Sequence, residues 1–382
     1  MKNHLLKRVL SMILVVAMLA GFYVPGAQAA STGFSWKESD QKVSFDLTDR
    51  EAETHVEQPY DVTDIVRVSI VLEKASTMQA GFRSRLVAQN DQAMAYNRQL
   101  LTEQEELAGK ISSQALGGKP LDVVWNLTVV GNIISANVPY GKIPAIKRVN
   151  GVQDVFVEMQ YEPCVVEREE NVAQPQMFSS LGMAGSYQVW SNGYTGAGSR
   201  IAVIDTGTDI NHQSLDADAF LYALEQNAKA AGISYSEYVK GLDLLDEQEI
   251  ASVLGDLKIS QRISGLTASD LYIDEKLAFG ANYVDYDLNV QHIYDEQGEH
   301  GSHVAGIATA NSWLYNAASD SYGKAMDYCF MQGVAPEAQL LTMKVFGKGG
   351  SPYDSDYMAA IEDAIVLGAD VVNLSLACSP PL

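Results

Sequence analysis

Basic residues and cysteines are scarce in this sequence. It contains 26 lysines and arginines against 48 aspartates and glutamates, which gives a formal net charge of −22 at pH 7. Nucleic-acid phosphates would be repelled by such a charge, so no nucleic-acid partner is expected. Cysteine occurs three times, at Cys164, Cys329 and Cys378. An odd number does not make a disulfide framework, and none of the three has a histidine motif that suggests a thiol nucleophile, so we expect small apolar interior residues.

The N-terminus has the order of a secretory signal. Lys2, Lys7 and Arg8 precede a mostly apolar stretch from Val9 to about Phe22, and small residues follow at Ala27–Ala29. We assign residues 1–29 to a signal peptide, which predicts a secreted or cell-envelope protein. A membrane anchor is the alternative, but the stretch is short for a bilayer span of about 20 apolar residues.

The length of 382 residues, 47% of them hydrophobic, suggests about two domains after the signal. After a linker at 30–60, residues 61–162 alternate between strand and helix patterns in the order β-α-β-β-α-β, which predicts a ferredoxin-like α+β domain. A generic small α+β domain is the alternative. Residues 163–177 are polar and contain two prolines, as expected for an exposed processing linker. The second domain is assigned to residues 178–382.

Two motifs in the second domain carry the chemistry. The apolar run Ile201–Ile204 predicts a buried parallel strand, and Asp205 follows at its carboxyl end, where open α/β sheets place catalytic groups. The second motif begins with His300 and Gly301 and continues in small and apolar residues, as expected for a closely packed helix. A buried carboxylate at Asp205 would fix the tautomer of a histidine and stabilise its protonated form.

Each motif also has a less specific interpretation. A strand that ends in Asp-Thr-Gly occurs in many α/β proteins. His300 and His303 are one helical turn apart and could bind a metal. Because no third ligand and no His-Glu-x-x-His pattern is present, we predict no metal site there and expect His303 to be a structural histidine.

Together, the motifs around Asp205 and His300 resemble the Asp and His blocks of the subtilases, the subtilisin-like serine peptidases. The resemblance implies a serine endopeptidase that hydrolyses protein or peptide substrates with a Ser-His-Asp triad. It also implies a three-layer α/β domain with a parallel sheet. The serine block of the family, Gly-Thr-Ser, does not occur in this sequence. We therefore expect a chain truncated before the catalytic serine and the oxyanion-hole asparagine, with an incomplete sheet and no activity as given.

The resemblance extends to substrate binding. The glycines of the stretch 347–351 are similar to the edge that pairs with substrate backbone in subtilases, which implies this role for Gly349 and Gly350. Ser375, Leu376 and Ala377 resemble the strand that lines the pocket for the residue before the scissile bond. Ala377 replaces the usual glycine there. From Gly349 and Gly350 alone, a simple loop would be the interpretation.

The position of residues 61–162 before the Asp block resembles that of the inhibitory propeptide of subtilases, which implies that the chain's own propeptide occupies the cleft. Segments 279–285 and 295–300 are similar to lactocepin-type cell-envelope proteinases, which suggests cell-wall attachment through a C-terminal region that is missing here. A different hypothesis is a non-catalytic protein whose propeptide-like domain binds and inhibits other subtilases.

An acidic insertion is predicted between the two blocks, at about residues 213–290. Residues 216–299 contain seventeen acidic and five basic side chains, which we interpret first as a solvated surface. Asp285, Asp287 and Asp295 could also bind calcium, although no twelve-residue calcium loop is present. No cofactor is required by the predicted chemistry, and Ca²⁺ would serve stability.

Overall fold

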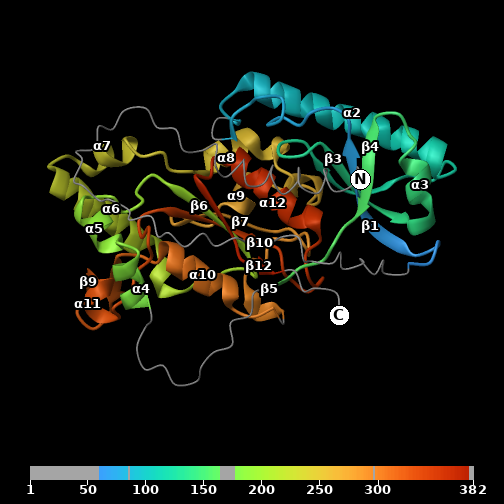
Figure 1. The fold of residues 1–382 in the computed structure, drawn as a ribbon. Coiled ribbons are helices and arrows are strands. Elements are labelled where there is room, and N and C mark those ends of the chain that lie inside the picture. The colour runs from blue at the N-terminus through green and yellow to red at the C-terminus, as the bar shows by residue number, and fades with distance from the viewer. Residues whose placement is uncertain (1–59, 85–86, 164–176, 296, 378–382) are drawn as a thin grey trace, which may run out of the picture. The chain divides into compact units, whose positions relative to one another are not determined.

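The computed structural model describes residues 60–84, 87–163, 177–295 and 297–377 (Figure 1). The predicted signal peptide at 1–29 and nearly all of the linkers at 30–60 and 163–177 lie outside these residues. Within the described part of the chain, no helix is both long and apolar enough to cross a membrane.

The N-terminal domain, residues 61–162, has the predicted order of elements. They are β1 (Ile65–Leu72), α2 (Asp91–Ala115), β2 (Asp122–Leu127), β3 (Ile133–Pro139), α3 (Ile143–Ile146) and β4 (Val152–Val157). The four strands form an antiparallel sheet in the order β2-β3-β1-β4. Asn90 begins α2 because its side-chain oxygen accepts the N–H groups of Gln92 and Ala93.

The two faces of this sheet differ in polarity. Val66, Val68 and Ile70 of β1 are buried in an apolar core with Leu107 and Ile111 of α2. The alternate residues of β1, including Arg67 and Ser69, lie on the other face, as the two-residue period of a strand requires. That second face is not left to solvent, because it packs against the second domain.

The second domain is built on a parallel sheet in the order β11-β6-β10-β7. Its strands are β6 (Arg200–Asp205), β7 (Leu277–Asn282), β10 (Gln339–Lys344) and β11 (Val371–Leu374). Helix α10 (His300–Thr309) covers one face and α12 (Asp354–Val366) covers the other (Figure 1). Ala202 and Ile204 of β6 accordingly pack in the core beneath α12, whereas Val203 packs with Ala305 of α10.

The predicted insertion at 213–290 includes too much of the chain. It contains β7, whose six residues are all buried in the sheet, so the C-terminal part of the range is core and not acidic surface. The rest is helical. Its helices are α6 (Ala217–Ala231), α7 (Tyr235–Lys240), α8 (Glu247–Val253) and α9 (Ala268–Leu271), with short 3-10 turns at Gln213–Leu215, Leu254–Asp256 and Ile259–Gln261.

Smaller elements complete the described chain. They are β5 (Glu162–Pro163), α4 (Met177–Met183), α5 (Ser186–Ser191), β8 (Trp313–Asn316), β9 (Ser321–Lys324), α11 (Ala325–Tyr328), β12 (Leu376–Ala377) and 3-10 turns at Tyr140–Lys142 and His292–Tyr294. Strands β8 and β9 form a hairpin, and β5 pairs with β12. Cys329, predicted to be an interior residue, is a partly buried free thiol. Cys164 and Cys378 lie outside the described residues.

Candidate active site

Asp205 and His300 meet at the carboxyl edge of the parallel sheet, as predicted. Asp205 is the last residue of β6 and only 1% exposed, and His300 is the first residue of α10. The Nδ1 atom of His300 lies 2.8 Å from Oδ1 of Asp205, and the N–H of Thr206 donates to the same oxygen at 2.7 Å. The histidine side chain is 21% exposed. With Nδ1 held by the carboxylate, Nε2 is the ring atom available for proton exchange with a bound group.

Two glycines permit this contact. A Cβ at Gly301 would lie 2.3 Å from the carbonyl oxygen of Gly207 and 3.1 Å from Cβ of Asp205. Gly207 has φ of +106°, and a Cβ there would lie 2.3 Å from the carbonyl oxygen of Val290. The close packing expected for this helix is therefore confirmed at Gly301, where the start of α10 lies against the end of β6.

A buried lysine supports the turn after Asp205, and sequence reasoning missed it. Lys344 pairs with Asp205 in the strand register, its Nζ donates to the carbonyl oxygen of Thr206, and it forms a 2.8 Å ion pair with Asp295. The two side chains are 0% and 3% exposed. The hydroxyl of Thr206 also accepts the N–H of Gly301 at 2.9 Å. The sequence signal that could have found it is a lysine at the end of the strand Gln339–Lys344, all six residues of which are buried in the structure.

The structure gives no support to metal binding by the histidine pair. His303 lies on the exposed side of α10. Among the described residues, no group of three or more His, Cys, Asp or Glu side chains could hold a metal ion.

The three carboxylates considered for calcium bind protein groups. Asp285 accepts the N–H groups of Lys348 and Gly349, Asp287 accepts the N–H of Asn289, and Asp295 pairs with Lys344. Calcium binding elsewhere in the chain stays a prediction.

The predicted substrate edge at Gly349 and Gly350 is a tight turn. Gly347 and Gly350 exchange backbone hydrogen bonds at 3.2 and 3.0 Å, and Gly349 donates to Asp285. The next residues pair instead with the end of the N-terminal domain. Tyr353 forms an antiparallel bridge with Gln160, and the carbonyl oxygen of Pro352 accepts the N–H of Tyr161 at 3.1 Å.

The predicted pocket strand meets the same segment. Leu376 and Ala377 pair antiparallel with Pro163 and Glu162. The hydroxyl of Ser375 donates to the side chain of Asn373 at 3.1 Å. Residues 159–163, which we call the tail of the N-terminal domain, thus lie between the loops that follow β10 and β11. These strands are the two neighbours of β6, whose end carries Asp205.

Asp354 fixes the tail at the start of α12. The N-cap of this helix is Tyr353, not Asp354, and the N–H of Tyr353 donates to Asp356 at 2.9 Å. The carboxylate of Asp354 instead accepts the N–H of Met159 at 2.9 Å and the hydroxyl of Tyr161 at 2.8 Å.

Buried carboxylates join α12 to the polar face of the N-terminal sheet. Asp356, 2% exposed, accepts the indole N–H of Trp125 at 2.8 Å and pairs with Arg67 at 3.2 Å. Glu158 accepts the hydroxyls of Ser69 and Ser355 at 2.8 and 2.7 Å. Burial raises the pKa of both carboxyl groups, and the hydrogen bonds and Arg67 oppose that rise.

Comparison with known proteins identifies the second domain. Residues 196–380 match the sequence profile of the Subtilase family. The chain belongs to the subtilases. Among its relatives, the minor extracellular protease Vpr of Bacillus subtilis (strain 168) is 28% identical over 250 residues, which cover 63% of this chain and 22% of Vpr. The PI-type proteinase of Lactococcus lactis subsp. cremoris is 31% identical over 252 residues, 65% of this chain and 10% of that proteinase.

A solved subtilase structure is also similar. The epidermin leader peptide processing serine protease from Staphylococcus aureus matches with 14% sequence identity and a TM-score of 0.41, over 82% of this chain and 50% of that one. The chain spans about a fifth of the length of Vpr and about a tenth of that of the PI-type proteinase.

Proposed function

We propose that this subtilase chain belongs to a secreted serine endopeptidase precursor. Asp205 and His300 would be two members of its Ser-His-Asp triad, and residues 61–162 would be its inhibitory propeptide, with a ferredoxin-like fold. The observation that carries this proposal is the antiparallel pairing of residues 160–163 with the loops after β10 and β11, on the sheet edge that bears the Asp205–His300 pair.

In the proposed reaction, a serine hydroxyl attacks the peptide carbonyl and gives its proton to Nε2 of His300. Asp205 keeps the proton of the ring on Nδ1 and stabilises the imidazolium that results. His300 then gives the proton to the leaving amine. No Gly-Thr-Ser sequence occurs in the 382 residues. We therefore propose that a polypeptide of these residues alone does not hydrolyse peptides.

The tail has the features of a bound peptide chain. An extended peptide that adds to exposed strand edges gains affinity from main-chain hydrogen bonds on both sides. The tail has this arrangement, because Tyr161 donates to Pro352 on one side and Glu162–Pro163 pair with Leu376–Ala377 on the other. We propose that a substrate would take the same place, with Ser375, Leu376 and Ala377 along one side and residues 351–353, rather than Gly349 and Gly350, along the other.

The cis contacts favour a propeptide over a free inhibitor of other subtilases. Glu362 of α12 is fully buried and accepts the N–H groups of Thr128, Val129 and Val130 at 2.8–2.9 Å. The N-terminal domain is thus bound to its own second domain through a carboxylate that would be left without these donors if the domain bound elsewhere.

Secretion, cell-envelope localisation and peptide substrates are parts of the same proposal, and Vpr is itself described as extracellular.

The test is a comparison of two histidine variants. The complete coding sequence that contains codons 1–382 is expressed, and casein hydrolysis by its product is measured for the parent, His300→Ala and His303→Ala. We expect His300→Ala to lower kcat/KM by at least about 10³-fold, because the general base is lost. His303 is exposed on the same helix, so His303→Ala should keep the parent activity. Activity that survives His300→Ala, or casein hydrolysis by residues 30–382 alone, would contradict the proposal.

A further inference from the structure

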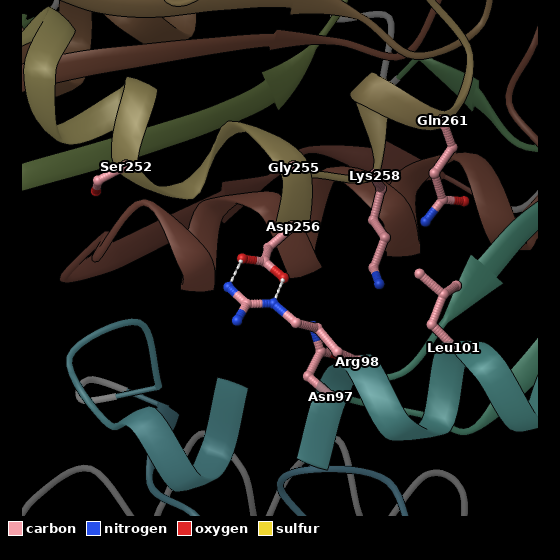
Figure 2. Close-up of a pocket in the computed structure, with 8 residues that line it drawn as sticks. All are labelled: Asn97, Arg98, Leu101, Ser252, Gly255, Asp256, Lys258 and Gln261. Atoms are coloured by element: carbon pink, nitrogen blue, oxygen red, sulfur yellow. Dashed lines mark hydrogen bonds and ion pairs between the residues drawn. The ribbon is translucent and has the colours of Figure 1, made fainter. Parts of the chain in front are cut away.

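A second surface of the catalytic domain contacts the N-terminal domain, away from the tail and α12. It is formed by residues 254–262, which follow α8 in the segment between Asp205 and His300, and we call it the docking segment. Its side chains reach two elements of the N-terminal domain, α2 and β2. Figure 2 shows Asp256, Lys258 and Gln261 of this segment facing Arg98 and Leu101 of α2.

The contact with α2 is a bidentate ion pair. Nε and Nη2 of Arg98 donate to the two carboxylate oxygens of Asp256 at 2.9 and 2.7 Å (Figure 2). Asp256 is 7% exposed and Arg98 is 63% exposed, so the carboxylate is buried while the guanidinium is partly in solvent. A pocket of about 290 Å³ lies beside the pair and is lined by both of its residues. The fork geometry makes this position selective for arginine.

The contacts with β2 come from the end of the docking segment. The N–H of Asn126 donates to Oε1 of Gln261 at 3.3 Å, and Nη1 of Arg262 lies 3.4 Å from the carbonyl oxygens of Val123 and Val124. The Arg262 guanidinium lies 5.8 Å from the ring centre of Trp125 and 4.2 Å from that of Tyr286. Trp125 is fully buried among these groups. Tryptophan and arginine are the residues that most often dominate binding energies at interfaces.

The docking segment differs from Glu362 in what it recognises. Glu362 accepts backbone N–H groups, which any domain with the same loop geometry could present. Asp256 and Arg262 contact the side chains of Arg98 and Trp125, which depend on sequence. Specificity requires contacts that a wrong partner cannot make, and a buried carboxylate without its arginine penalises such a partner.

We propose that residues 254–262 are a recognition surface for the chain's own N-terminal domain, with Asp256 and Arg262 selecting that domain by its Arg98 and Trp125. The proposal rests on the function proposed above, because it treats the N-terminal domain as a bound propeptide. The acidic composition of residues 216–299 suggested only a solvated surface. The proposal assigns a protein partner to one segment of it.

A charge-reversal cycle on residues 30–382 tests this assignment. The variants are Arg98→Glu, Asp256→Arg and the double substitution, and Arg148→Glu is the control because Arg148 is an exposed arginine elsewhere on the same domain. Hydrogen exchange followed by mass spectrometry measures the protection of residues 121–131, which include the N–H groups bound to Gln261 and Glu362. Because residues in contact couple measurably, we expect each single substitution to speed this exchange roughly fivefold. The double variant should restore the exchange rate of the parent.

The outcomes separate the two proposals. Single reversals that leave the exchange of residues 121–131 unchanged, or a double variant that is not restored, would overturn the recognition surface. Hydrogen exchange in the tail tests the proposed function instead. If the N–H of Tyr161 in the parent exchanges as fast as in an unstructured peptide, the propeptide role fails. If that N–H is protected while the cycle shows no coupling, only the recognition surface fails.

Discussion

The carboxylate of Glu362 accepts the backbone N–H of Val129 at 2.8 Å, although the two residues belong to different domains. Both residues are fully buried, and the ammonium group of Lys258 lies 3.3 Å from the other carboxylate oxygen. The glutamate therefore accepts hydrogen bonds from the turn between β2 and β3 and also balances the charge of a buried lysine. The contact between the domains depends on this charge.

Glu362→Gln should lower the free energy of unfolding by about 3 kcal/mol. The substitution keeps the shape of the side chain but removes the charge that Lys258 and the N–H groups require, and breaking a buried pair in this way is costly. Urea unfolding of residues 30–382 measures the free energy of unfolding. Glu225→Gln is the matched control, because Glu225 forms an exposed pair with Lys229 and should change that free energy by less than about 0.5 kcal/mol. Equal effects of the two substitutions would refute this account.

Trp125→Ala should cost about 3–5 kcal/mol of unfolding free energy, the usual range for a fully buried tryptophan. Part of that cost comes from Asp356, which would lose the indole N–H. Phe156 of the same domain is 38% exposed and serves as the control. Phe156→Ala should be clearly milder in the same urea titration. If the two variants unfold at the same urea concentration, Trp125 is not the anchor that the structure indicates.

Gly301→Ala should separate His300 from Asp205. The new Cβ would lie 2.3 Å from the carbonyl oxygen of Gly207, so α10 has to move, at a cost of about 2 kcal/mol or more. The NMR signal of the Nδ1 proton of His300 should lose its strong hydrogen-bond shift. Gly306 lies in the same helix with nothing within 4 Å of its Cβ position, and Gly306→Ala should stabilise the chain by up to about 1 kcal/mol. An unchanged proton signal in Gly301→Ala would contradict the packing described.

The pH dependence of stability should include a contribution from Asp363. Burial raises the pKa of its carboxyl group to about 7, against the hydrogen bonds from Lys258, Ile259 and Tyr283. An unfolded aspartate ionises near pH 4, so the unfolded state loses its proton first as the pH rises. The stabilising contribution is therefore complete below about pH 4 and is lost as the pH approaches 7, by an amount on the order of a few kcal/mol.

Asp363→Asn isolates this contribution. The free energy of unfolding of the parent, minus that of the variant, should fall between pH 4 and pH 7.5. Asp270→Asn is the control, because Asp270 is exposed and the hydroxyl and N–H of Thr267 lower its pKa, so its contribution changes only below about pH 4 and the corresponding difference should stay constant over this range. A difference between the parent and Asp363→Asn that stays constant over this range would show that Asp363 is already ionised in the folded protein.

Much of the fold was predictable because its signals are local. The strand and helix patterns of residues 61–162 predicted the order of their elements, and the apolar run before Asp205 predicted the buried strand β6. His300 was found through its motif, although 95 positions separate it from Asp205. These patterns involve only neighbouring residues, so they can be recognised without knowing which other strand or helix an element packs against.

The buried charges were not predictable, since their partners lie far away in the sequence. Helix α12 carries the apolar residues Met358, Ile361, Ala364 and Ile365, yet Asp356, Glu362 and Asp363 are among its most buried residues. A carboxylate in a helix suggests a solvated face until its donors are known, and these donors come from β2, the loop after it and the docking segment. Lys344 was missed for the same reason, because its burial depends on Asp295.

A disulfide trap tests most directly whether the tail occupies the proposed substrate edge. Gln160 and Tyr353 are opposite each other in antiparallel pairing, a geometry in which two cysteines can form a disulfide. Gln160→Cys and Tyr353→Cys are combined in residues 30–382 with Cys164, Cys329 and Cys378 changed to serine, and free thiols are counted by mass spectrometry after mild oxidation. The account predicts complete loss of both thiols, whereas a control pair of Gln160→Cys with Lys348→Cys keeps them. Free thiols in the first pair, or equal oxidation of both pairs, would contradict a propeptide tail bound along this edge.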